Sequence, residues 1–139
     1  MHGSRPSSAP GSLGSSNSSS LNDPRSLERA ASALRCLPFR HAFYQLLSAE
    51  AISSEELHQR ADQPQLTFLP LSSDRAEDHF IWLIRVGVLR REVDGQGLTE
   101  RVRLTPMGRE LLERWSGEIP RASLLERIRH GLRRRWPRL

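Results

Sequence analysis

Several features that would assign this chain to a familiar class of protein are missing from its sequence. Cys36 is the only cysteine in 139 residues, which excludes an intrachain disulfide and suits a reducing cytoplasm. No run of about 18 or more apolar residues occurs, so the sequence predicts no transmembrane helix. The N-terminus lacks the apolar segment of a signal peptide. We therefore expect a cytoplasmic protein.

The patterns that mark common active sites are missing as well. No G-x-S-x-G motif is present, so no serine nucleophile of that type is indicated. Gly95-x-Gly97 falls in a predicted hairpin turn and not between a strand and a helix, so it is not a phosphate-binding loop. Cys36 and His41 are too few for a zinc site, which needs three or four ligands. We expect a protein that is not an enzyme and holds no cofactor or metal.

Lysine is absent, and the 21 basic residues, all arginines, are unevenly distributed. Residues 121–139 contain seven arginines and one acid, Glu126, which gives this segment a net charge of +6. Since the whole chain carries +5, residues 1–120 sum to −1. The basic character therefore belongs to the C-terminal segment, and the composition indicates no basic patch on the rest of the chain.

Composition and periodicity divide the chain into three parts. Residues 1–22 are mostly Ser, Gly, Pro and Asn, and we expect a disordered arm because they have too few apolar residues to form a core. Residues 24–118 alternate helix-period segments with turn signals and form the predicted domain. Residues 120–139 form a predicted basic amphipathic helix, which opens at a Ser123-x-x-Glu126 capping box.

Within the domain, the apolar spacing predicts five helices. The segment 62–72 carries two prolines and is predicted to be a long connection. Gly87 ends the helix over 73–86, because the residue after a helix often needs a positive φ. The five helices begin near residues 24, 38, 53, 73 and 106.

Two alternating segments, 88–93 and 98–104, predict an antiparallel hairpin. Asp94-Gly95 is a turn signal, and Gly97 allows a bulged loop. The predicted fold class is therefore mostly α with a small β-hairpin. In the second segment, alternation places Leu98, Glu100, Val102 and Leu104 on one face, and Thr99, Arg101 and Arg103 on the other.

The segment over 80–115 carries resemblances to known families. The phrases Gly87-Val88-Leu89-Arg90-Arg91 and Leu104-Thr105-Pro106-x-Gly108 resemble those that bracket the wing of bacterial winged helix-turn-helix regulators. The run WLIRVGVLRREVDGQGLT, with ALRCLPFR upstream, more closely resembles a family of short uncharacterised cyanobacterial proteins. That second resemblance covers residues 30–116 and implies no activity.

The winged-helix resemblance implies a DNA-binding protein, a transcriptional regulator that contacts DNA with helix 73–86 and the wing 88–104. The helix nevertheless has two arginines and three acids, which give it a net charge of −1. The alternative interpretation is that its arginines are part of a solvated helix surface and contact no DNA. In the DNA-binding hypothesis Arg75 and Arg85 would read bases, while Arg91, Arg101 and Arg103 would hold phosphates.

Trp82 lies off the apolar arc of helix 73–86, so something should cover it or bind it. We favour the interpretation in which another segment of the chain covers its ring, since tryptophan is usually buried. The alternative is that Trp82 docks a protein partner.

The C-terminal helix has an apolar arc about 120° wide with arginines around it. It could lie on an anionic membrane, enter a groove of a partner, contact nucleic acid, or pack its apolar arc on the domain. The second hypothesis is a non-enzymatic adaptor that binds protein through the winged-helix surface, with the basic tail engaging an anionic partner or a membrane surface. The charge of the domain favours this hypothesis, and a homodimer is left open. The candidate polyanion or membrane contacts are Arg127, Arg129, Arg133, Arg134, Arg135 and Trp136.

Overall fold

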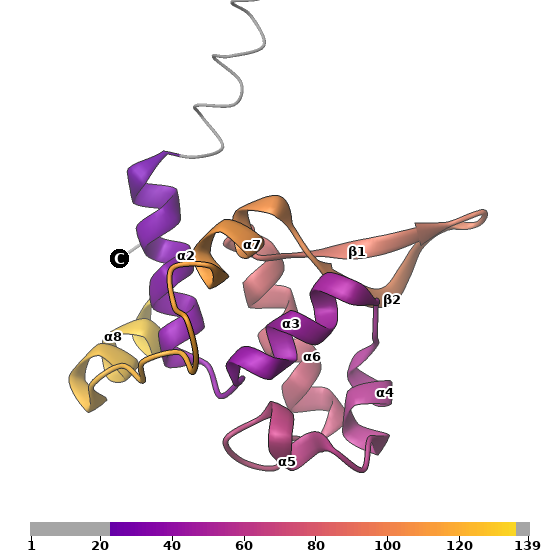
Figure 1. Cartoon of the computed structure of the whole chain (residues 1–139), viewed down its shortest axis with the longest axis horizontal. Helices are drawn as coiled ribbons and strands as arrows, with labels where there is room; N and C mark the ends of the chain where they lie inside the picture. The colour runs from indigo at the N-terminus through magenta and orange to yellow at the C-terminus, as the bar shows by residue number, and fades with distance from the viewer. Residues whose placement is uncertain (1–22, 136–139) are drawn as a thin grey trace, which may run out of the picture.

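A computed structural model describes residues 23–135, in which helices pack around one core and a hairpin extends from one end (Figure 1). The predicted arm over 1–22 lies outside the described residues. The predicted fold class, mostly α with a small β-hairpin, is confirmed. None of the helices within 23–135 has the length and apolar character needed to cross a bilayer. In chain order the elements are α2 (Pro24–Cys36), α3 (His41–Ala49), α4 (Ser54–Gln59), α5 (Gln63–Leu66), α6 (Ser73–Arg85), β1 (Leu89–Asp94), β2 (Gly97–Leu104), α7 (Pro106–Leu112) and α8 (Leu124–Arg135).

The core is centred on an aromatic cluster between the start of α3 and the middle of α6. Phe39 and Phe43 stack with ring centroids 4.2 Å apart, and Phe80 lies 5.9 Å from Phe43. Tyr44 meets Phe43 edge-on at 5.1 Å. All four rings are fully buried, so a few aromatic residues supply a large share of the buried apolar area.

Helix α4 begins at a capping box near the predicted residue 53, and it is joined to the hairpin. The Ser53 hydroxyl accepts a hydrogen bond from the Glu56 N–H, and the Glu56 carboxylate accepts one from the Ser53 N–H, both at 3.1 Å. One residue earlier, Ile52 exchanges two backbone hydrogen bonds of 3.2 and 2.8 Å with Val102 of β2. The residues that precede α4 are therefore hydrogen-bonded to β2.

The connection over 62–72 is more regular than predicted, because its middle forms the short helix α5. Pro64 lies in the first turn of α5, where the missing N–H of proline costs no helical hydrogen bond. The buried amide of Gln63 donates to the Leu57 carbonyl at 3.1 Å and accepts from the Leu71 N–H at 3.0 Å. This buried amide joins the two ends of the connection and holds it against the core.

Helix α6 confirms the prediction for 73–86 to within one residue. The Ser72 hydroxyl caps it by accepting a hydrogen bond from the Arg75 N–H at 3.2 Å. Its core face, which includes Phe80, is buried as the periodicity predicts. Gly87 follows with a φ of +89°, a conformation that glycine adopts without a steric penalty.

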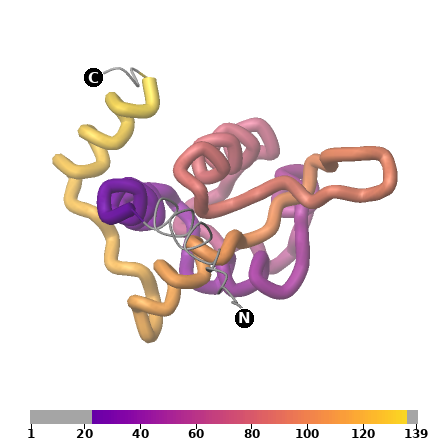
Figure 2. The backbone as a smooth tube through the Cα atoms, turned by 90° about the horizontal axis from the view of Figure 1, so that it is seen from above, coloured from indigo at the N-terminus to yellow at the C-terminus, as the bar shows by residue number. Residues whose placement is uncertain are grey.

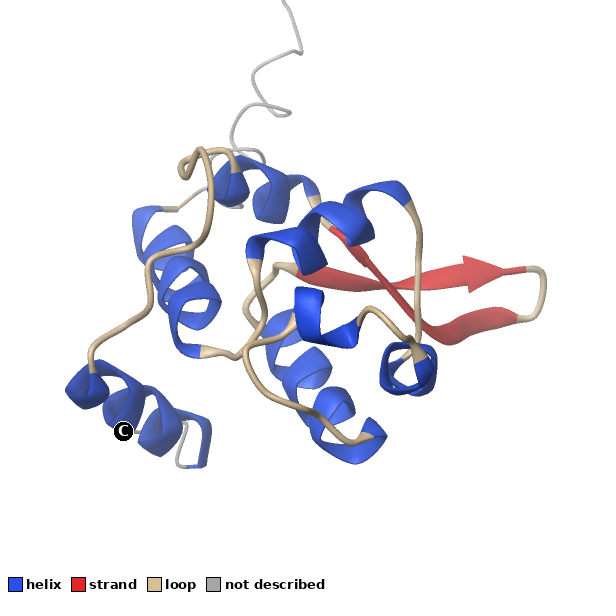
Figure 3. Ribbon diagram, turned by 60° about the horizontal axis from the view of Figure 1, so that its bottom comes forward, coloured by secondary structure: helices blue, strands red, loops and turns tan. Residues whose placement is uncertain are grey.

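The hairpin forms where it is predicted, but its outer half does not reach the core. The strands pair from Leu89–Leu104 to Arg91–Val102, and an irregularity then shifts the pairing to Val93–Leu98. Val102 is buried, whereas Val93 and Leu98 are 61% and 76% exposed. Leu98, predicted on the same face as Val102, therefore lies beyond the edge of the core. Alternation assigns faces but does not locate the edge of the core, and the strands project beyond the helices (Figure 3).

Helix α7 starts at Pro106 as predicted and ends at Leu112. The Thr105 hydroxyl accepts from the Gly108 N–H at 3.0 Å and donates toward the Gly87 and Val88 carbonyls. Gly108 is buried against the hairpin. A Cβ at this position would lie 2.6 Å from Cδ1 of Leu104 and 2.7 Å from the Val88 carbonyl oxygen.

Helix α8 lies with its apolar arc turned away from the domain, so the interpretation in which this arc packs back on the domain is wrong. Its buried residue is the polar His130, because the helix is held by polar contacts to α2 and α6. Trp136 lies outside the described residues. The apolar residues Leu124, Leu125, Ile128 and Leu132 are 68%, 60%, 52% and 45% exposed.

Two glycine-to-alanine substitutions test the packing of α7. Gly108→Ala should lower the free energy of unfolding by about 1–3 kcal/mol, since its methyl group would collide with a carbonyl oxygen of the backbone. Gly131→Ala in α8 meets no atom within 4 Å and should leave stability unchanged or raise it by up to about 1 kcal/mol. Urea unfolding measures both, and equal stability of the two variants would contradict the described packing of α7.

Candidate nucleic-acid interface

Helix α8 is attached to the domain by the polar side that bears Glu126 and His130. The Glu126 carboxylate pairs with the Arg35 guanidinium of α2 at 2.6 Å. The Nε2 atom of His130 accepts a hydrogen bond from the Trp82 indole N–H at 2.8 Å, and the two rings meet edge-on. Figure 2 shows α8 beside α2 at the end of the molecule away from the hairpin. Trp82 is thus half-buried under α8, as in the interpretation that another segment covers it.

Arg134 forms a third link between α8 and α6. Its guanidinium donates to the Asp78 carbonyl at 3.2 Å and contacts Nδ1 of His79 at 3.0 Å. The same group lies 5.8 Å from the centroid of the Trp82 ring. Because Arg134 contacts a backbone carbonyl and a neutral ring, its positive charge is not cancelled by these contacts.

A groove of about 470 Å³ lies between α6 and α8 and is rich in arginine. Arg75 and Arg85 line it from α6, and Arg134 and Arg135 line it from α8. The lining includes one carboxylate, Asp78. Within residues 23–135, no salt bridge of 4.0 Å or less joins these four arginines to a carboxylate. The structure therefore brings the two arginines predicted on α6 together with two of those predicted on α8.

A second groove, of about 440 Å³, lies on the other side of the Trp82–His130 contact. Arg29 of α2 and Arg133 of α8 line it, and Arg85 contributes to both grooves. The remaining candidates on α8, Arg127 and Arg129, are exposed on its surface. Arginines from three helices therefore surround the covered tryptophan.

Two histidines at this site are affected by the surrounding charge. Burial is the main cause that lowers the pKa of His79 from 6.5 to about 4, and Arg134 and Arg75 lower it further. The pKa of His130 also falls to about 4, because of burial first and then Arg134 and Arg133. Both rings are therefore neutral at physiological pH, and a neutral His130 can accept the indole hydrogen bond.

The three arginines predicted to hold phosphates on the hairpin are engaged by carboxylates of the same chain. Arg91 pairs with Glu77 of α6, and Arg103 pairs with Glu92 of β1. Arg101 pairs with Glu56 of α4 at 3.1 Å. Each pair reduces the charge that the hairpin offers to a phosphate, and the structure does not join these arginines to the arginine-lined groove.

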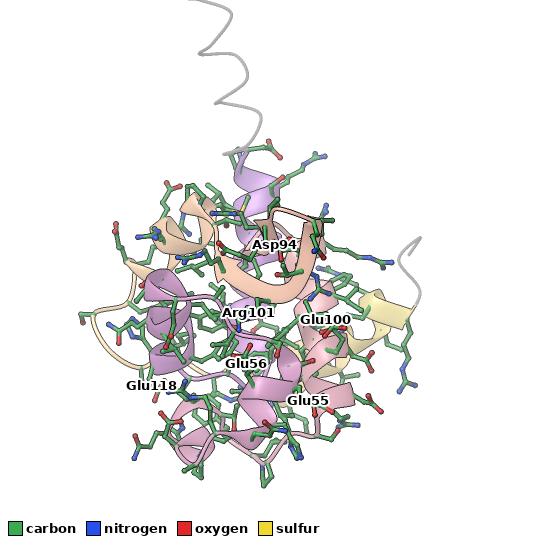
Figure 4. All side chains as sticks on the ribbon, turned by 90° about the vertical axis from the view of Figure 1, so that its right-hand side faces the viewer. Glu55, Glu56, Asp94, Glu100, Arg101 and Glu118 are labelled. Atoms are coloured by element: carbon green, nitrogen blue, oxygen red, sulfur yellow. The ribbon has the colours of Figure 1, made fainter. Side chains whose placement is uncertain are left out.

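The hairpin end of the molecule is acidic around Arg101. Glu55 and Glu56 of α4 and Asp94 and Glu100 of the hairpin face the same side (Figure 4). Glu55, Asp94 and Glu100 are exposed. Since α8 lies at the opposite end (Figure 1, Figure 2), the described chain has one acidic end and one basic end.

The sequence interpretation missed His130 and Glu126 as the contacts that place α8. Glu126, His130 and Arg134 are spaced four residues apart and therefore share one side of the helix. All three make contacts to α2 or α6. This spacing is the signal that could have identified the docking side, but the apolar arc gave a stronger pattern.

Comparison with known proteins gives one family match. Residues 20–134 match the model of the Npun_F0494-like family. The match includes residues 30–116, over which the sequence resembles a family of short proteins. No curated protein and no solved structure matches significantly.

The Trp82–His130 contact should be sensitive to acid. When α8 is docked, the pKa of each histidine is about 4, whereas the ordinary pKa is 6.5. The docked state is therefore fully stabilised above pH 6.5. This stabilisation is lost as the pH falls from 6.5 toward about 4, because protonated His130 cannot accept the indole hydrogen bond. With Trp115→Phe and Trp136→Phe in place, the emission of Trp82 should shift to the red over this range.

The variant His130→Gln is the control for this titration. Its amide oxygen can accept the indole hydrogen bond but does not titrate, so the shift should become smaller and should then follow His79 alone. Emission that stays constant from neutral pH to about pH 4 in the parent protein would contradict the assigned contact.

Proposed function

The chain belongs to the Npun_F0494-like family, and we propose that it is a DNA-binding protein whose phosphate contacts lie in the groove between α6 and α8. One observation carries this proposal. Four arginines from two helices converge on a groove whose lining includes a single carboxylate. Phosphate contacts from arginine supply most of the affinity of such proteins for nucleic acid. We place this binding in transcriptional regulation, the role that the winged-helix resemblance implies.

The order of the elements supports a winged-helix architecture for this function. Helices α3, α4 and α6 precede the β1–β2 hairpin, and the bridge from Ile52 to Val102 adds a short third segment to the pair. In this architecture α6 is the recognition helix and the hairpin is the wing. Arg75 and Arg85 are exposed on α6, as base or phosphate contacts require.

The position of α8 favours contact with the phosphate backbone over deep insertion into a groove of DNA. Helix α8 covers Trp82 on the outward side of α6, and Asp74 and Asp78 are exposed on the same helix. Carboxylates at these positions repel phosphates, whereas Arg134 and Arg135 extend the basic surface beyond α6. The proposed contact is therefore to the DNA backbone across α6 and α8, with the hairpin in a minor role.

An adaptor that binds another protein is the second candidate, and the acidic hairpin end favours it. Glu55, Asp94 and Glu100 are exposed there, and Val93 and Leu98 expose apolar side chains on the same hairpin. An apolar contact surrounded by acids suits a basic protein surface. In this alternative the hairpin, and not α6, is the main binding element.

A double substitution in the groove tests the DNA-binding proposal. Arg75→Gln with Arg85→Gln should weaken binding to duplex DNA, measured by fluorescence anisotropy over a range of salt concentrations. The slope of log K against log salt should become shallower by about 1.8, since each lost phosphate contact removes about 0.9. Among residues 23–135, the salt bridges do not include these two side chains, and Arg75 takes part in the cap of α6 only through its backbone N–H, so the variant should remain folded.

The matched control is Arg90→Gln with Arg114→Gln. Both arginines are exposed and lie outside the groove, and the net charge changes by the same amount. The control should keep the parent slope. Equal changes in the two double variants would mean that overall charge, and not the groove, attracts DNA, and the proposal would then be wrong.

The adaptor alternative makes a different prediction. Glu55→Gln with Glu100→Gln should abolish co-purification of a basic protein partner, because it removes two exposed charges from the acidic end. Nuclease treatment should leave that co-purification unchanged, and Arg75→Gln with Arg85→Gln should not affect it. A partner that is lost after nuclease treatment would count against the adaptor.

A further inference from the structure

The apolar arc of α8 faces away from the domain that the helix is docked on. Leu124, Leu125, Ile128 and Leu132 are each about half exposed or more. At 100° per residue they lie on the side of the helix opposite Glu126 and His130, the residues that hold it to α2 and α6. The polar side is therefore used for attachment, and the apolar side is left uncovered by the described part of the chain.

Arginines border this apolar arc on both sides. Arg127 lies along one edge and Arg129 along the other, and both are exposed. Helix α8 contains five arginines and one glutamate, so its net charge is +4. An apolar stripe bordered by arginines is the pattern of helices that lie in the interface of an anionic bilayer. The arginine stems can cover apolar surface while the guanidinium groups reach the lipid phosphates.

Charge argues against a second copy of the chain as the occupant of this face. A symmetric contact through the stripe would bring two helices of net charge +4 side by side. Nucleic acid would satisfy the arginines but not a row of four aliphatic side chains. An anionic lipid surface supplies both an apolar interior and negative phosphates within a few ångströms of each other.

We propose that α8 is a membrane-surface anchor that lies in the plane of an anionic bilayer. Leu125, Ile128 and Leu132 enter the boundary between head groups and acyl chains, and Arg127 and Arg129 contact lipid phosphates. Because the docking contacts lie on the opposite side of the helix, the domain stays attached while the helix is bound. This inference does not depend on DNA binding, which is assigned to the groove facing α6.

Co-sedimentation of the full chain with lipid vesicles tests the anchor. The chain should bind vesicles of equal parts phosphatidylcholine and phosphatidylglycerol, and should bind pure phosphatidylcholine much more weakly. Leu125→Gln with Ile128→Gln and Leu132→Gln should lower the partition coefficient on anionic vesicles by roughly 30-fold or more. The control substitutes three exposed apolar residues elsewhere, Leu69→Gln, Val93→Gln and Leu98→Gln, and should bind like the parent.

A second pair of variants tests the arginines independently of the apolar stripe. Arg127→Gln with Arg129→Gln should reduce binding to anionic vesicles by roughly 30-fold, since each arginine near the surface contributes about 1 kcal/mol. The control Arg90→Gln with Arg114→Gln has the same net charge as this double variant and should leave vesicle binding unchanged. Far-UV circular dichroism checks that α8 remains helical in every variant.

Three results would overturn the proposal. The first is a parent chain that does not sediment with anionic vesicles. The second is undiminished vesicle binding by the triple variant of the stripe. The third is self-association of the parent chain that the triple variant abolishes without loss of vesicle binding, which would make the stripe a contact between copies. Loss of DNA binding by the groove variant, with vesicle binding intact, would separate the two proposals.

Discussion

The placement of α8 depends on a hydrogen bond from the Trp82 indole to His130, which acts together with the Arg35–Glu126 pair and the contacts of Arg134. This hydrogen bond requires a neutral imidazole, and burial together with the nearby arginines keeps the ring neutral. These contacts together fix which side of α8 faces the domain, and both the arginine-lined groove and the exposed apolar stripe follow from that orientation. A docking contact that was apolar would have placed the arginines in solvent and removed the stripe.

The division of charge between the two ends comes from pairing as well as from composition. Residues 1–120 are close to neutral in sum, yet their arginines have different partners. Arg91, Arg101 and Arg103 on the hairpin have carboxylates within salt-bridge distance, whereas Arg75 and Arg85 on α6 have none among the described residues. Counting charges along the chain therefore underestimated the basic surface of the domain, because it could not tell paired arginines from unpaired ones.

Local patterns predicted the parts of the fold that local interactions determine. The capping box at Ser53, the hairpin, and the positive φ at Gly87 each depend on residues close in sequence, and all three are present. The role of Gln63 and the docking of His130 depend on partners far along the chain. The four-residue spacing of Glu126, His130 and Arg134 marks one side of α8 but does not identify the residues that this side contacts. For the site, Arg75 and Arg85 were placed correctly on the outer side of α6, but their neighbours on α8 could not be predicted.

The hydroxyl of Thr105 has a mechanical consequence for the hairpin. It contacts the carbonyls of Gly87 and Val88 before β1 and also caps α7, so both ends of the hairpin meet at one side chain. The base of the hairpin is thereby clamped, while its tip extends past the core without support (Figure 1). A displacement of the hairpin tip is therefore transmitted through this fixed base to α6 and α7 together.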